Sequence, residues 1–292
     1  MDLSPSMRKR ILKFQQDEIN GSIIYLEIAG MMKNESNRKI FIEISQAERL
    51  HYEQWKSFTS QEVSPNWFQV HWYKLLYKIL GETFVIKLLE HFEQFGIQEL
   101  AAIIEKIPEA KTIIDQEKVH ENKLISMIDE EKLQYVGAMV LGLNDALVEL
   151  SGTIAGMTFA LASTKLVALA AIITGFAATL SMAASNYLAE RANRSETAVK
   201  SSIYTGMAYL ITVVLLILPY LILPDAFYVA AFIIMIVMVV LIIGSFNFYV
   251  SVVQSIPFWS RFTEMATITL GISALSFVIG IIAKNILGVD VG

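Results

Sequence analysis

Residues 166–189 read LVALAAIITGFAATLSMAASNYLA and contain no charged side chain. A helix needs about 20 apolar residues to cross the hydrocarbon core of a bilayer, which is about 30 Å thick. Four further stretches are apolar and long enough to cross it, and they lie near 136–162, 203–223, 226–254 and 263–287. The second half of the chain is therefore predicted to be a membrane domain with five helical spans.

Charged residues are concentrated in the first half of the chain. Residues 1–135 contain 17 Lys and Arg and 21 Asp and Glu, whereas residues 136–292 contain only 6 and 7. All four histidines lie in the first part, and the chain has no cysteine, which excludes disulfides and thiolate metal sites. The net charge of −5 gives no reason to expect nucleic acid as a partner.

Two features predict that the first half lies in the cytoplasm. The basic residues 8–10 are followed by Asp17 before an apolar segment of signal-peptide length could form. Positive residues in short loops mark the inner side of a membrane. With the N-terminus inside, the inner loops carry more of them than the outer segments, which hold only Lys165 and Lys284. We expect a multi-pass protein of the cytoplasmic membrane.

The first predicted span carries two acids on one helical face, since Asp145 and Glu149 are four residues apart. Charged side chains within a span are costly and usually functional, and two acids suit a bound cation or a transported proton. Alternatively the span begins later, and both acids lie among the lipid headgroups. On the second span a stripe of Met182, Asn186 and Glu190 is predicted to line the same pathway, with the thioether as a soft ligand or as packing.

Two further patterns lie on the spans. Gly152, Gly156 and Ala160 place small residues at every fourth position, a spacing that lets another helix approach closely and that indicates a dimer face. Asn247 on the fourth span either lines the pathway or bonds a neighbouring helix.

Turn signals divide the first half into helices near 7–33, 36–59, 82–106 and 109–131. An aromatic segment, 66–80, lies between the second and the third. It is expected to cover the other helices or to rest on the membrane interface. No segment of the first half shows the alternation of apolar and polar residues that is typical of a strand, so the whole chain is predicted to be all-α.

Two of these helices carry a Glu-x-x-His pair, Glu48 with His51 and Glu117 with His120. Residues three apart share a helical face. A four-helix bundle that binds two metal ions takes such a pair from two helices and a lone Glu from each of the others. The first helix offers Glu18, and the third offers Glu90 and Glu93. A single Glu-x-x-His pair usually lies on a solvated helix surface by chance. Two such pairs on alternate helices, with apolar neighbours, favour a metal site. Carboxylates and imidazoles suit iron or manganese, and zinc would also accept them.

The first half resembles the rubrerythrin branch of the ferritin-like family in four segments, DEINGSIIY (17–25), ISQAERLH (44–51), EHFE (90–93) and DQEKVHE (115–121). The resemblance implies a di-iron centre held by Glu18, Glu48, His51, Glu90, Glu93, Glu117 and His120. The cysteine module that supplies electrons to peroxidases of that family has no counterpart in this sequence.

The segments GLNDALVELSGTIAGMTFAL (142–161) and GFAATLSMAASNYLAERA (175–192) resemble the first two spans of the vacuolar iron transporter family. This resemblance implies five spans, a dimer, and export of Fe(II) or Mn(II) in exchange for protons, with Asp145, Glu149 and Met182 near the pathway. The glutamate-rich insertion of the vacuolar members between spans two and three is absent. The combination of both halves resembles the bacterial and archaeal membrane-bound ferritins.

Together these features predict a ferritin-like four-helix domain at 1–134 and a five-span domain at 135–292. The expected function is export of Fe(II), with Mn(II) second, by proton antiport from a homodimer whose cytoplasmic bundle captures or senses iron. The alternative is a membrane-anchored di-iron ferroxidase or peroxide-scavenging enzyme. The acids within the span count against it, because an anchor gains nothing from them.

Overall fold

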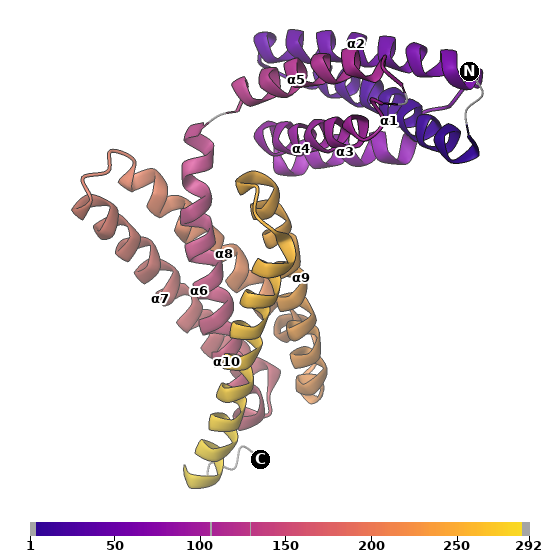
Figure 1. Cartoon of the computed structure of the whole chain (residues 1–292). Helices are drawn as coiled ribbons and strands as arrows, with labels where there is room; N and C mark the ends of the chain where they lie inside the picture. Colours follow the sequence, from indigo (N-terminus) through magenta and orange to yellow (C-terminus); the bar gives the residue numbers. More distant parts are fainter. Residues whose placement is uncertain (1–3, 106, 129, 288–292) are drawn as a thin grey trace. The chain divides into compact units, whose positions relative to one another are not determined.

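The computed structural model describes residues 4–105, 107–128 and 130–287, and all regular elements in these ranges are helices (Figure 1). The all-α prediction is confirmed. Contacts between residues separate the chain into two compact units, Met1–Asp129 and Glu130–Gly292. The helix α6 begins at Glu130, so residues 130–134, predicted as the end of the first domain, belong to the second unit by these contacts.

In the described residues of the N-terminal unit there are five helices, α1 (Pro5–Ala29), α2 (Glu35–Thr59), α3 (Trp67–Leu80), α4 (Glu82–Ala101) and α5 (Ala110–Ser126). Side-chain caps explain three of the starting points, since Ser4, Asn34 and Asn66 accept hydrogen bonds from backbone N–H groups of the first turns. The helix α1 packs along α2, α4 packs along α5, and α3 contacts both α1 and α4.

The helix α4 is shorter than its predicted span of 82–106. It ends at Ala101, and the chain then turns so that Ile103 and Ile107 become fully buried beside Leu100 in the apolar core. Pro108 has no N–H group and disfavours a helical conformation at the residue before it, which keeps α5 separate from α4. Burial of these isoleucines therefore decides where α4 ends.

The aromatic segment forms α3 and covers part of the unit. Its inner face buries Val70 and Tyr73, whereas Phe68, Trp72 and Ile79 are exposed. The connection from α2 is held by the buried Asn20, whose Oδ1 accepts from the backbone N–H of Asn66 (2.8 Å). A buried amide needs hydrogen-bond partners, so this bond from Asn66 holds the start of α3 against α1.

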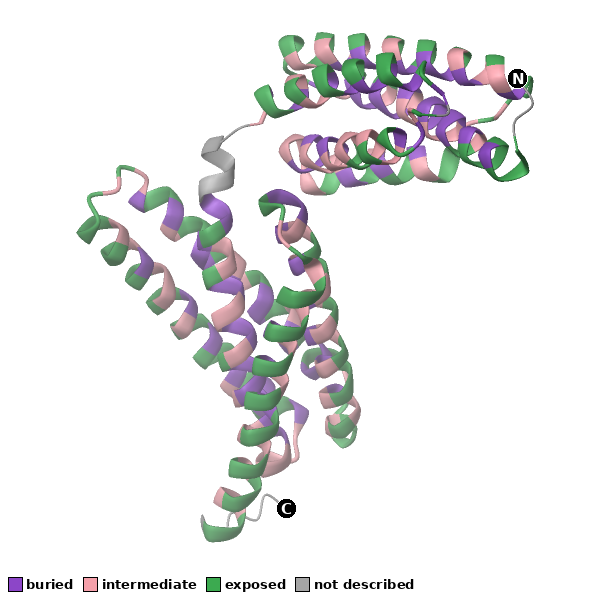
Figure 2. Cartoon of the chain, viewed as in Figure 1, coloured by how far each residue is buried: buried purple, intermediate pink, exposed green. Residues whose placement is uncertain are grey.

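The second unit contains the helices α6 (Glu130–Leu161), α7 (Thr164–Ala192), α8 (Ala198–Ile222), α9 (Tyr228–Gln254) and α10 (Phe258–Leu287), with a short 3₁₀ turn at Asp225–Phe227. All five are long and apolar enough to cross a membrane, which confirms the number of predicted spans. Of the five, α6 and α8 are the most buried, and α10 is the least (Figure 2). Exposed apolar side chains on such helices suit contact with lipid.

Glycines allow α6 to approach its neighbours closely. A Cβ atom on Gly142 would collide with the backbone of Thr205 on α8, and one on Gly280 of α10 would collide with the backbone of Gly156. A Cβ on Gly152 would lie 3.0 Å from Ser276 Oγ, also on α10. The small residues Gly152 and Gly156, predicted as a dimer face, thus face α10 of the same chain.

We expect Gly142→Ala to lower the thermal unfolding temperature of the detergent-solubilised protein. The added methyl group meets backbone atoms that cannot rotate away, and overpacking of this kind costs about 1–3 kcal/mol. The matched control is Gly137→Ala on the same helix, where a Cβ meets nothing within 4 Å. Equal unfolding temperatures for the two variants would contradict the close approach of α6 to α8.

Candidate metal centre and membrane carboxylates

Four helices of the N-terminal unit bring carboxylates and imidazoles together in its interior. Two groups have ligand atoms that lie within 4.8 Å of one another. The first consists of Glu18, Glu48, His51 and Glu117, and the second of Glu48, Glu93, Glu117 and His120. Each Glu-x-x-His pair therefore offers its histidine to one group and its glutamate to both. This cluster has the ligand pattern of a two-metal site in which two carboxylates are shared.

The shared Glu117 lies between the two histidines. Its Oε1 is 2.8 Å from His51 Nδ1, and its Oε2 is 3.1 Å from His120 Nδ1. The second shared acid, Glu48, places Oε1 3.1 Å from His120 Nδ1, and Glu18 Oε2 is 3.6 Å from His51 Nδ1. Both imidazoles thus direct one nitrogen at the carboxylates.

Two buried atoms of the cluster have no hydrogen-bond partner, Glu48 Oε1 and His51 Nδ1. Each lies at contact distance from another ligand atom, but the angles are not those of a hydrogen bond. Buried polar atoms are nearly always hydrogen-bonded, and an exception calls for a physical reason. Nitrogen and oxygen atoms that converge in the interior without hydrogen-bond geometry suit a bound cation, so the donor set fits a metal.

Neighbouring side chains orient the ligands. The ring nitrogen His51 Nε2 lies 2.7 Å from Gln116 Oε1, Trp55 Nε1 donates to Glu18 Oε1 (3.0 Å), and the Tyr25 hydroxyl donates to Glu93. A proton on His51 Nε2 leaves Nδ1 free to bind a metal, and such outer partners set the orientation of metal ligands. Sequence reasoning missed Gln116 and Trp55. Trp55 could have been found, because it lies four residues after His51 on the same face of α2.

The crowded acids shift one another's pKa values. Burial and the charges of Glu117 and Glu18 raise the pKa of Glu48 well above its usual range, and burial and Glu117 do the same for Glu93. Burial would also raise the pKa of Glu117, but its hydrogen bond with His120 and its close contact with His51 lower it. Burial lowers the pKa of His51, but its contacts with Glu117 and Glu18 outweigh this effect and raise it to about 10. The cluster therefore favours positive charge, as protons or as a cation.

Of the two acids predicted on α4, only Glu93 lies in the cluster. Glu90 is also buried, but its Oε2 lies 2.8 Å from Lys87 Nζ, and it belongs to neither group. Spacing alone did not distinguish the two, because residues three apart share a helical face.

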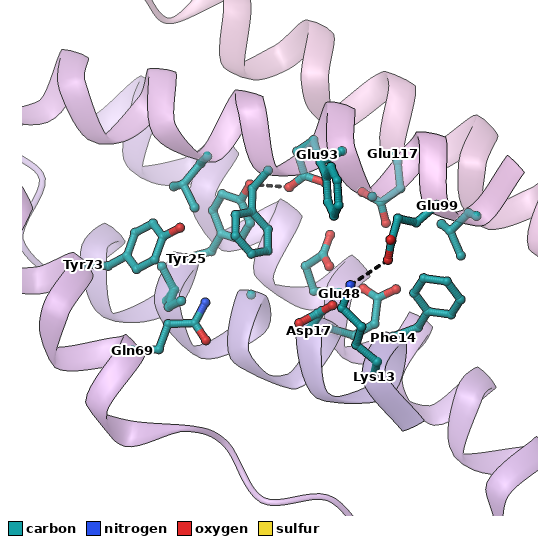
Figure 3. Close-up of a pocket in the computed structure, with 18 residues that line it drawn as sticks. Lys13, Phe14, Asp17, Tyr25, Glu48, Gln69, Tyr73, Glu93, Glu99 and Glu117 are labelled. Atoms are coloured by element: carbon teal, nitrogen blue, oxygen red, sulfur yellow. Dashed lines mark hydrogen bonds and ion pairs between the residues drawn. The ribbon is translucent and has the colours of Figure 1, made fainter. Parts of the chain in front are cut away.

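A cavity of about 190 Å³ adjoins the cluster, lined in part by Glu18, Glu48, Glu93 and Glu117. Figure 3 shows the carboxylates of Glu48, Glu93 and Glu117 pointing toward one another beside it. Asp17 also lines the cavity, and burial raises the pKa of its carboxyl to about 6. The ligands are thus next to an open volume.

In the second unit the predicted acids lie on α6. Asp145 is half-buried, and Glu149 is exposed, with Oε2 accepting a hydrogen bond from the buried Tyr209 of α8 (2.8 Å). On α7, Met182 packs against the apolar core of the unit, and Glu190 is half-buried. Both α6 acids are therefore accessible from outside the isolated chain, and one is oriented by a tyrosine.

Asn186 has protein partners on α8. It is buried, and its amide donates to Ser201 Oγ (3.0 Å) and Thr205 Oγ1 (2.7 Å). The Thr205 hydroxyl lies 3.1 Å from the carbonyl oxygen of Ala138 on α6. The side chain predicted to line a pathway thus links three helices.

We expect Asn186→Ala to lower the thermal unfolding temperature, because a lost hydrogen bond that leaves buried partners unpaired costs about 1–3 kcal/mol. Ser185→Ala, an exposed neighbour on α7, is the matched control. Metal flux should then scale with the amount of folded protein. Loss of flux from a variant that unfolds at the wild-type temperature would instead place Asn186 on the transport pathway.

Comparison with known protein families matches part of the membrane unit. Residues 136–198 match the VIT family, and this segment covers most of α6, all of α7 and the first residue of α8. No curated protein and no solved structure matched the chain. The match and the five apolar helices point to a multi-pass membrane protein, and the family suggests a transporter of metal ions. The expected resemblance of the first two spans is thereby confirmed.

Proposed function

We propose that the chain exports divalent metal ions, Fe(II) first and Mn(II) second, across the cytoplasmic membrane in exchange for protons. The observation that carries this proposal is the VIT-family match over residues 136–198, the segment that contains Asp145 and Glu149. We place the N-terminal unit in the cytoplasm and expect a homodimer.

The acids on α6 explain how the exchange would work. A carboxylate must lose its proton before it can bind a metal ion, so metal and protons compete for one site. Asp145 and Glu149 would bind the dehydrated ion on one side and take up protons on the other. Tyr209 would orient Glu149 through the hydrogen bond from its hydroxyl. The proton gradient then supplies the driving force.

The cluster of the N-terminal unit would collect the metal. We propose Glu18, Glu48, His51, Glu93, Glu117 and His120 as ligands. Glu90, the other acid predicted on α4, lies outside both ligand groups. The buried, unpaired Glu48 Oε1 and His51 Nδ1 support this assignment. The ligand resemblance to rubrerythrins favours iron, and a bound iron pair would supply redox chemistry. The buried ligands would hold the ion, and Gln116, Trp55 and Tyr25 would orient those ligands.

Metal flux in sealed proteoliposomes with an internal pH dye tests the transporter. Fe(II), Mn(II) and Zn(II) are added separately to vesicles with and without protein. We expect metal uptake and opposite proton movement for Fe(II) and Mn(II) that require the protein. If neither metal nor protons move, the transporter proposal is rejected.

The second candidate is a membrane-anchored di-iron ferroxidase, favoured by the two shared carboxylates of the cluster. Fe(II) oxidation by the detergent-solubilised protein, measured by absorbance, distinguishes it. Oxidation that is lost in Glu48→Ala, in a protein that moves no metal, would support the enzyme over the exporter.

A further inference from the structure

Two helices line the cavity beside the metal cluster with regularly spaced residues. The spacing is four residues on α1 and three on α4, so each set lies along one helical face. Among the residues that line the cavity are Lys13, Asp17 and Gly21 on α1, and Glu93, Gly96 and Glu99 on α4, together with apolar side chains of both helices.

The outer end of the cavity is marked by an ion pair. Lys13 Nζ lies 2.6 Å from Glu99 Oε2, and the two side chains are 53% and 31% exposed. Figure 3 shows this pair beside Asp17, with the carboxylates of Glu48 and Glu117 nearby. At the inner end Glu48 is only 5% exposed, and its Oε1 has no hydrogen-bond partner. Acidic groups therefore line the cavity from solvent to the cluster.

Glycines keep the space between these ends open. A Cβ on Gly96 would meet no atom within 4 Å, and the nearest atoms to one on Gly21 would be those of the Glu48 side chain, at 3.5 Å or more. Glycine within a helix costs about 0.5–1 kcal/mol relative to alanine. Gly21 and Gly96 thus each cost helix stability, and both leave the cavity unfilled because they have no side chain.

We propose that this cavity is the entrance through which hydrated divalent cations reach the cluster, with Asp17 and Glu99 as an outer capture site that Lys13 occupies until a cation replaces it. The inference rests on the proposed metal-binding role of the cluster. The ammonium group of Lys13 pairs with the Glu99 carboxylate and so provides the positive charge that an arriving cation would later provide. A neutral oxidant would gain nothing from the outer acids, whereas acidic clefts raise the association rates of cations by about 10 to 1,000-fold.

Stopped-flow binding of Co(II) to the full chain in detergent tests the entrance, with the absorbance of bound Co(II) as the signal. We expect Asp17→Asn to slow binding about 10-fold at low salt and less at high salt, because screening weakens attraction between charges. Lys13→Gln should speed it, because Glu99 becomes free. Gly96→Leu should slow it by filling the cavity. The number of Co(II) ions bound at equilibrium should stay at the wild-type value in all three variants.

Gln98→Leu, an exposed position on α4, is the matched control and should bind Co(II) at the wild-type rate. Thermal unfolding checks that Gly96→Leu folds. Wild-type rates for Asp17→Asn and Gly96→Leu, with unchanged stoichiometry, would overturn the entrance and leave the cluster intact. Slowing by Gln98→Leu as well would overturn it, since the effect would not depend on the cavity. A wild-type protein that binds no Co(II) would reject the metal centre together with its entrance.

Discussion

Alanine at Glu117 is expected to remove metal binding from both positions of the N-terminal cluster at once. Its two carboxylate oxygens lie 2.8 Å and 3.1 Å from the two histidines, and it belongs to both ligand groups. Alanine at Glu18, which belongs to one group only, should leave one position filled. The measurement is the amount of Mn(II) or Fe(II) per chain after desalting of the full-length protein under anaerobic conditions.

Glu43→Ala is the control for this pattern. Glu43 is a glutamate of α2 that pairs with Lys123 at 3.0 Å, and its side chain is 65% exposed. We expect this variant to bind the wild-type amount of metal. Equal losses in the Glu117 and Glu18 variants would contradict the sharing of Glu117 between two positions, and a wild-type metal content in Glu117→Ala would remove that residue from the site.

Asp145→Ala is expected to abolish metal-dependent proton movement in proteoliposomes while the N-terminal cluster still binds metal. Asp145 lies within α6, in the segment that matches the VIT family, and few other acids lie within the five spans. Without its carboxylate, metal and protons would lose the site for which they compete. The readouts are metal uptake and the internal pH dye, with metal content of the purified variant measured in parallel.

Glu196→Ala serves as the matched control, because Glu196 is an exposed acid in the connection between α7 and α8. It should transport at the wild-type rate. Wild-type transport by Asp145→Ala would remove this acid from the mechanism. Glu149, whose carboxylate is oriented by Tyr209, would then be the acid of the pair that binds metal and protons. Lost transport in both variants would instead indicate a general effect of charge.

The sequence by itself determined the helical class, the five membrane-spanning helices and the residue types available for a metal site. These properties are local, because the length and apolarity of a segment decide whether it can span. The spacing of Glu48 and His51 likewise places them on one face whatever surrounds the helix. The likeness of the first two spans to the VIT family also depends on local sequence alone.

Only the tertiary structure decided which of these residues meet. Spacing within a helix does not specify how that helix is rotated against its neighbours, so the sequence could not separate Glu93 in the cluster from Glu90 beside Lys87. For the same reason Asn186, one of a stripe of candidate pathway residues, was not recognised as a link to Ser201. Long-range packing makes these choices, because the partners of Glu93 and of Asn186 lie on other helices.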